Sequence, residues 1–86
     1  MQVQAENLTA VMNRLKRAQG QLAGVLRMLE EGRECADVVT QLAAVSRALD
    51  KAGFAIIAAG LEQCIRAGED GAIDRAKLER VFLSLA

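Results

Sequence analysis

Apolar residues recur along this chain with the three- and four-residue spacing that is typical of amphipathic helices. The spacing predicts three helices, at about residues 6–30, 34–66 and 72–85. In the first two, the apolar positions follow heptads and form one seam along a long helix. The seam residues are Leu8, Val11, Leu15, Ala18, Leu22, Val25 and Leu29 in the first helix and Val38, Leu42, Val45, Leu49, Ala52, Ile56 and Ala59 in the second.

Short polar segments that contain glycine separate the predicted helices. Gly32 is the expected C-terminal cap of the first helix, because glycine adopts the left-handed conformation that often ends a helix. Asn7 or Thr9 is the candidate N-cap of the first helix, and Asp70 is the candidate N-cap of the third. The chain contains no proline, and alanine, leucine and glutamate are frequent. The predicted fold class is therefore all-α, in a single domain.

Two long helices joined by a short turn predict an antiparallel hairpin. The composition indicates that the hairpin does not stand alone, because 52% of the 86 residues are apolar and so short a chain buries little surface by itself. We expect two hairpins to form a dimeric four-helix bundle, with the third helix covering a flank or an end. Gly20 and Gly24 would then permit a close approach between helices, at about 1 kcal/mol each in helix propensity.

Two cysteines lie near the two ends of the second predicted helix. Cys35 and Cys64 are 29 positions apart, which corresponds to about 43 Å in a continuous helix. A disulfide requires Cα atoms within about 7 Å, so the two thiols of one chain cannot meet if the helix is continuous. An antiparallel helix of a second protomer would bring Cys35 to the partner's Cys64, twice by symmetry. Alternatively, both cysteines are small buried hydrophobic residues.

Basic residues concentrate in the first predicted helix although the net charge of the chain is zero. Residues 1–29 carry four basic residues and one acidic residue. Within that cluster, Arg14, Arg17 and Gln21 share one stripe beside the apolar seam, and Lys16 lies between the two arginines in sequence. No aromatic residue is interleaved, so contacts to DNA phosphates and groove edges are expected rather than base stacking. The alternative is a solvated outer face of the helix.

The absence of histidine excludes most templates for metal sites and for Ser–His or Cys–His catalysis. No glycine-rich phosphate loop follows a predicted strand either. The sequence therefore predicts a protein that is not an enzyme and that holds no metal or other cofactor. The longest uncharged stretch near the middle is too short to span a bilayer, and the first residues lack the layout of a signal peptide. We expect a cytoplasmic protein with reduced thiols.

Several segments of the two long predicted helices together form a specific pattern: residues 14–21, Gly24, 27–28, 35–38, 40–45 and 61–64. Through these segments, over about residues 8–66, the sequence resembles the copper-sensitive operon repressor (CsoR) family. The resemblance implies an all-helical homodimer that pairs into a disc-shaped homotetramer. It also implies a repressor that binds operator DNA and releases it when an inducer reacts at the cysteines.

The resemblance assigns the DNA contacts of the family to basic residues of both long helices. In the first helix these are Arg14, Lys16 and Arg17, beside which Gln21 continues the stripe. In the second helix the corresponding basic position is Arg47 or Lys51.

The resemblance also indicates an inducer. The copper site of the family combines a cysteine at the start of the second helix with a His-Leu-x-x-Cys segment of the other chain. Here Cys35 and Cys64 match the cysteines, but Gly60 stands at the histidine position. This pattern favours the persulfide-sensing branch, the CsoR-like sulfurtransferase repressors (CstR). In that branch, reactive sulfur species link the two cysteines between protomers as a di- or polysulfide and DNA is released.

Two alternatives remain at this stage. One is a copper(I)-sensing repressor that uses Cys35 and the partner's Cys64 without the usual histidine. The other is a helical oligomer with no DNA-binding role, which acts as a thiol carrier or binds a protein partner.

Overall fold

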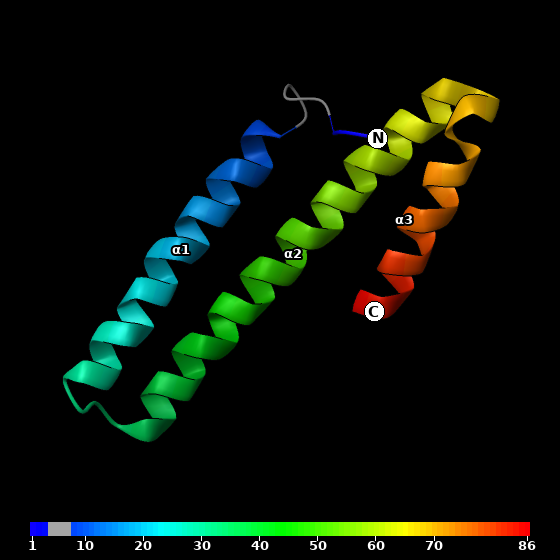
Figure 1. The fold of residues 1–86 in the computed structure, drawn as a ribbon. Coiled ribbons are helices and arrows are strands. Elements are labelled where there is room, and N and C mark those ends of the chain that lie inside the picture. The colour runs from blue at the N-terminus through cyan, green and yellow to red at the C-terminus, as the bar shows by residue number, and fades with distance from the viewer. Residues whose placement is uncertain (4–7) are drawn as a thin grey trace.

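The protein is a flat arrangement of three α-helices, seen in a computed structural model that describes residues 1–3 and 8–86 (Figure 1). Every regular element in those residues is helical, which confirms the predicted all-α class. No helix among them is both long and apolar enough to cross a bilayer. The elements are α1 (Thr9–Glu30), α2 (Cys35–Ala67), the short 3₁₀ helix η2 (Gly68–Gly71) and α3 (Ala72–Leu85).

The turn between α1 and α2 is set by a glycine with positive φ. Gly32 has a φ of 68°, and its N–H donates to the carbonyl of Leu29 at 3.2 Å. The N–H of Arg33 donates to the carbonyl of Met28 at 3.0 Å. This pair of bonds is a Schellman motif, in which left-handed glycine lets the chain satisfy the last helical carbonyls. The prediction that Gly32 ends the first helix is confirmed.

The other predicted caps have different outcomes. Residue 6, the predicted start of the first helix, and the candidate cap Asn7 lie outside the described residues. Thr9 is the first residue of α1 rather than its cap. The prediction for Asp70 is wrong, because that residue lies inside η2 and Gly71 takes the N-cap position of α3 without a side-chain bond. The chain tightens into a 3₁₀ turn after α2, which moves the start of α3 past the aspartate.

The hairpin of α1 and α2 uses only half of each predicted seam. Its buried positions recur every seven residues: Val11, Ala18 and Val25 in α1, and Val38, Val45 and Ala52 in α2. The intervening heptad positions are more open, with Leu22 at 43%, Leu42 at 47% and Leu49 at 47% exposure. Each long helix therefore keeps an apolar stripe that faces away from the hairpin seam.

Helix α3 folds back along the second half of α2 (Figure 1). The rings of Phe54 and Phe82 meet edge to face with their centroids 5.5 Å apart, a favourable aromatic arrangement. Leu78 packs over Gly60, where an added Cβ would lie 2.9 Å from Leu78 Cδ1. No residue of α3 itself is buried, so this helix also keeps an apolar face open.

The three helices form a layer about one helix thick. The principal extents are 54 × 25 × 13 Å, and a helix with its side chains is roughly 10–12 Å across. Such a layer leaves large apolar side chains exposed, which is the surface that the predicted dimer would cover. The close approach expected at Gly20 is not made within the described part of the chain, because a Cβ built there meets no other element of residues 1–3 and 8–86 within 4 Å.

Gly71 is the glycine whose missing side chain the packing requires most clearly. It is buried, and an added Cβ would lie 2.9 Å from Cys64 Cα and would overlap the Cys64 carbonyl. We expect Gly71→Ala to displace η2 and α3 from the end of α2, at a cost of about 1–3 kcal/mol, as for other overpacked sites.

The matched control is Gly20→Ala, which meets open space and should stabilise α1 by about 1 kcal/mol. Thermal unfolding followed by circular dichroism measures both variants. Equal melting temperatures for Gly71→Ala and the parent protein would contradict the packing of η2 against Cys64.

Candidate functional site

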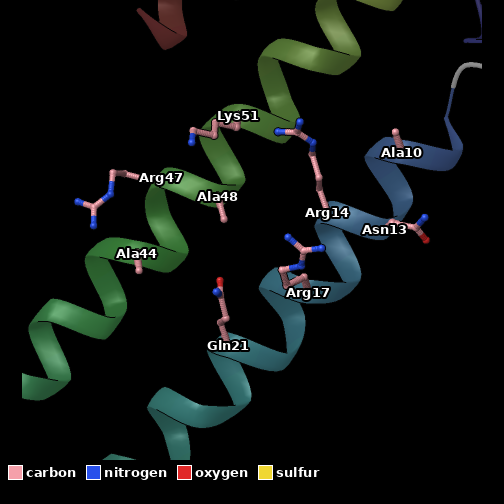
Figure 2. A pocket seen from close by; sticks show the side chains of 9 residues that line it. All are labelled: Ala10, Asn13, Arg14, Arg17, Gln21, Ala44, Arg47, Ala48 and Lys51. Atoms are coloured by element: carbon pink, nitrogen blue, oxygen red, sulfur yellow. The ribbon is translucent and has the colours of Figure 1, made fainter.

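Four cationic side chains line one groove between α1 and α2 (Figure 2). The groove has a volume of about 580 Å³, and none of its lining residues among residues 1–3 and 8–86 is acidic. It brings together five of the six residues that the sequence assigned to DNA. The lining residues are Ala10, Asn13, Arg14, Arg17, Gln21, Ala44, Arg47, Ala48 and Lys51.

Helix geometry explains why these side chains share the groove. Arg14, Arg17 and Gln21 are spaced by three and four residues, which places them on one face of α1. Arg47 and Lys51 are four residues apart on α2 for the same reason. Figure 2 shows Arg14 and Gln21 reaching from α1 into the space between the helices. Arg47 and Lys51 project from the side of α2 that faces away from α1. The positive charges are thus spread over both helices.

The middle of this basic groove is lined by two alanines and by the side-chain amide of Gln21. Ala44 and Ala48 of α2 are half-buried and leave the space between the helices open. Gln21 Oε1 is buried and has no hydrogen-bond partner among the residues that the structure describes. A buried acceptor of this kind is costly unless a donor reaches it. The groove can therefore offer an incoming ligand several cationic donors.

Lys16 does not line the basic groove, although the resemblance grouped it with the arginines. Each residue of an α-helix is rotated by about 100° from the previous one, so Lys16 is rotated by about 200° from Arg14. Its side chain is exposed on another face of α1. The six candidate DNA residues therefore divide into a group of five and one separate lysine.

The two cysteines lie near opposite ends of α2, which is one unbroken helix of 33 residues. Both thiols are free; Cys35 is exposed, whereas Cys64 is only 2% exposed. The premise of the sequence argument therefore holds, and no bond between them can form within one chain. Residues 1–3 and 8–86 of a single chain contain no group of three or more His, Cys, Asp or Glu that could hold a metal ion.

The first residues of the chain lie against Cys64 and its neighbour Gln63. Met1 Sδ lies 3.5 Å from Cys64 Sγ, and Gln63 Nε2 donates a hydrogen bond to the Gln2 carbonyl at 2.9 Å. Figure 1 shows the N-terminus beside the second half of α2. The sequence analysis did not identify Met1, because no periodicity relates residue 1 to residue 64.

The position at which the resemblance expects histidine is already filled. A Cβ on Gly60 would lie 2.9 Å from Leu78 Cδ1 and 3.5 Å from Met1 Cε. The α3 leucine and the N-terminal methionine thus occupy the space next to Cys64 that a larger side chain at position 60 would need.

The comparisons with known proteins agree with this geometry. Residues 7–84 match the family model of the metal-sensitive transcriptional repressors, and the chain belongs to that family. The copper-sensing transcriptional repressor CsoR of Mycobacterium ulcerans is 45% identical over 58 residues, which are 67% of this chain and 50% of the relative. The chain spans about half the length of the curated CsoR and RicR relatives that it matches.

Two solved structures share the fold. The copper-sensing repressor CsoR with Cu(I) from Geobacillus thermodenitrificans has a TM-score of 0.77 and 30% identity, with 98% of this chain and 91% of that chain covered. The nickel-responsive transcriptional regulator InrS has a TM-score of 0.75 and 29% identity, with 100% and 98% covered.

These findings confirm the predicted family and the prediction that the protein is not an enzyme, since the family consists of transcriptional repressors. The prediction that the protein uses no cofactor is contradicted. The family model describes metal-sensitive proteins, and the named relatives sense copper or respond to nickel. The absence of histidine suggested otherwise because it removes the ligand type on which most metal-site templates depend, but two thiols remain.

Proposed function

We propose that this protein is a copper(I)-responsive repressor that binds operator DNA through the basic groove. Copper(I) would bind between Cys35 of one protomer and Cys64 of the partner subunit, and DNA would then be released. The observation that carries the proposal is the placement of two free thiols near opposite ends of one unbroken helix. Two thiols placed in this way can bind one metal ion together only if they come from different chains.

A second protomer is required by both the thiols and the apolar surface. Leu42 and Leu49 form an open stripe on α2, on a layer too thin to enclose a core. Pairing α2 with an antiparallel α2 of a second copy would cover this stripe and join each Cys35 to the partner's Cys64. Further pairing into a homotetramer would repeat the basic grooves along the operator, where each copy adds phosphate contacts.

The donor set fits copper(I) better than nickel. Thiolates are soft ligands that suit copper(I), and the chain has no histidine to supply imidazole nitrogen. Copper(I) bound by one thiolate from each protomer would link the two protomers. Cys35 follows the turn that joins α2 to α1, and Cys64 is packed against Gly71 of η2.

A link between the two thiols would therefore fix one protomer's α1–α2 turn relative to the other protomer's α2–α3 junction. The basic grooves of the two hairpins would move relative to each other, and their fit to DNA would change. Coupling of this kind requires two assembly states with different affinity for DNA. A protein with this role would act in the cytoplasm, where the operator is.

A second candidate inducer is a reactive sulfur species, favoured by a site with two thiols and no histidine. One thiolate would attack the sulfane sulfur of an inorganic polysulfide, giving a cysteine persulfide and expelling a shorter polysulfide. The second thiolate would then attack the inner sulfur of the persulfide and expel hydrosulfide. The two thiols lose two electrons to the polysulfide, and a disulfide between protomers results.

One titration separates these candidates. Reduced protein is bound to fluorescent DNA from its own promoter, and anisotropy is followed during anaerobic addition of copper(I) or of inorganic polysulfide. We expect release at about one copper(I) per cysteine pair, and no such release from the Cys35→Ser variant, which still binds DNA. Release by polysulfide alone would favour the second candidate. A protein that does not bind the promoter DNA at all would contradict the repressor role and favour a helical oligomer with another partner.

A further inference from the structure

We propose that Met1 supplies a third sulfur ligand to the copper(I) site, in the place that histidine takes in the family resemblance. The site would then consist of Met1 Sδ and Cys64 Sγ from one protomer and Cys35 Sγ from the partner subunit. This inference rests on the proposed copper(I) response and adds to it the identity of a ligand.

The first observation is the distance between the two sulfur atoms of one chain. Met1 Sδ lies 3.5 Å from Cys64 Sγ. Sulfur ligands bind metals such as zinc at about 2.3 Å, so two sulfurs at this separation can both reach one ion. The Met1 residue is 53% exposed as a whole, but its side chain is only 15% exposed. The exposure therefore lies in the backbone, and the thioether is inserted beside the thiol.

The second observation is that Met1 occupies the space beside position 60. An added Cβ on Gly60 would lie 2.9 Å from Leu78 Cδ1 and 3.5 Å from Met1 Cε. The methionine therefore lies in van der Waals contact with the position of a side chain at residue 60, one helical turn before Cys64, and Leu78 makes the closer contact there. The absence of a side chain at Gly60 is what gives the thioether access to the thiol.

The third observation is that the segment carrying Met1 is held in place. Gln63, next to Cys64 in α2, donates a hydrogen bond from Nε2 to the Gln2 carbonyl at 2.9 Å. This bond fixes the backbone directly after Met1 against the same turn of α2 that carries the thiol. A ligand on a fixed backbone loses less freedom on binding than one on a free end.

The three sulfur ligands of the proposed site also favour copper(I) by their chemistry. Thioether sulfur is a soft, neutral donor that selects copper(I), as thiolates do. Two thiolates and one thioether give a three-sulfur site with no need for imidazole. Methionine elsewhere is a common filler of irregular gaps, so the test below separates a ligand from a filler.

The test replaces Met1 by leucine, which has a similar volume and no sulfur. To place leucine at residue 1, the protein is released from an N-terminal fusion by a protease that leaves no extra residue. Intact mass establishes the identity of residue 1 in each preparation. The matched control is Met12→Leu, prepared in the same way, because Met12 is 48% exposed on α1.

Copper(I) affinity is measured by competition with a chelator of known affinity. We expect Met1→Leu to lower the affinity at least about tenfold, the smallest effect usual for loss even of an outer-shell partner of a metal site. Met12→Leu should bind copper(I) like the parent, and Met1→Leu should react with polysulfide like the parent.

A direct readout is selenium X-ray absorption of protein with selenomethionine at position 1, in a Met12→Leu, Met28→Leu background. Copper(I) should appear as a neighbour of selenium. Unchanged affinity in Met1→Leu, or selenium without a copper neighbour, would overturn the inference while the two-thiolate site stands. Failure of the parent protein to bind copper(I) would overturn the proposed function and this inference together.

Discussion

Simultaneous replacement of Arg14 and Arg17 by alanine is expected to weaken operator binding by roughly 100-fold, because each guanidinium that donates to a phosphate is worth about 1.5 kcal/mol or more. Both side chains line the basic groove from α1. Each copy in an oligomer would lose the same two contacts. The hairpin should be unaffected, since neither arginine is buried, and copper(I) binding at the cysteines should be retained.

Fluorescence anisotropy with promoter DNA at several salt concentrations measures this effect. Loss of each phosphate contact should reduce the slope of log affinity against log salt by about 0.9. The charge-matched control removes two arginines outside the groove, Arg66 and Arg75, which pair on the surface with Glu62 and Glu79. A control that weakens binding as much as the groove variant would show that net charge, rather than the groove, determines affinity.

Lys16→Ala tests the division of the basic residues into two groups. Lys16 lies on a different face of α1 from the basic groove, so its loss should affect binding less than loss of Arg17. A larger effect from Lys16 would move the DNA-binding surface to the other face of α1.

The two long helices and the turn between them could be predicted from the sequence, because the features that determine them are local. Heptad spacing, the absence of proline and one left-handed glycine at Gly32 determine two long helices and the turn between them. The same locality placed Arg14, Arg17 and Gln21 on one face, because residues three and four apart on a helix are neighbours. The inference that Cys35 and Cys64 cannot meet within a chain needed only the length of a continuous helix.

Features that depend on contacts between distant segments were not accessible in this way. Asp70 looked like a cap, but the packing of Gly71 on Cys64 draws the junction into a 3₁₀ turn first. Met1 lies beside Cys64 although 63 positions separate them. The spacing of residues along a sequence does not reveal a contact between such distant positions. The prediction that no cofactor is used was wrong for a different reason, because it relied on the absence of histidine.

The second large effect concerns the cysteines themselves. Cys35→Ser and Cys64→Ser should each bind promoter DNA like the parent and should each lose release by copper(I), because either change leaves one thiolate at every site. The loss of copper(I) affinity should exceed the roughly 10- to 100-fold that removal of an outer-shell partner costs a metal site. Retained release in either variant would contradict a shared two-thiolate site.

Mixing the two variants makes the expectation specific to a site between protomers. A mixed dimer holds one chain with Cys64 alone and one chain with Cys35 alone, so one of its two junctions again has both thiols. After unfolding and joint refolding at equal concentrations, half of the dimers should be mixed, and tight copper(I) binding should return at about one quarter of the parent stoichiometry. Each variant refolded alone is the control. If each site lay within one chain, mixing would restore nothing, because no chain in the mixture has both thiols.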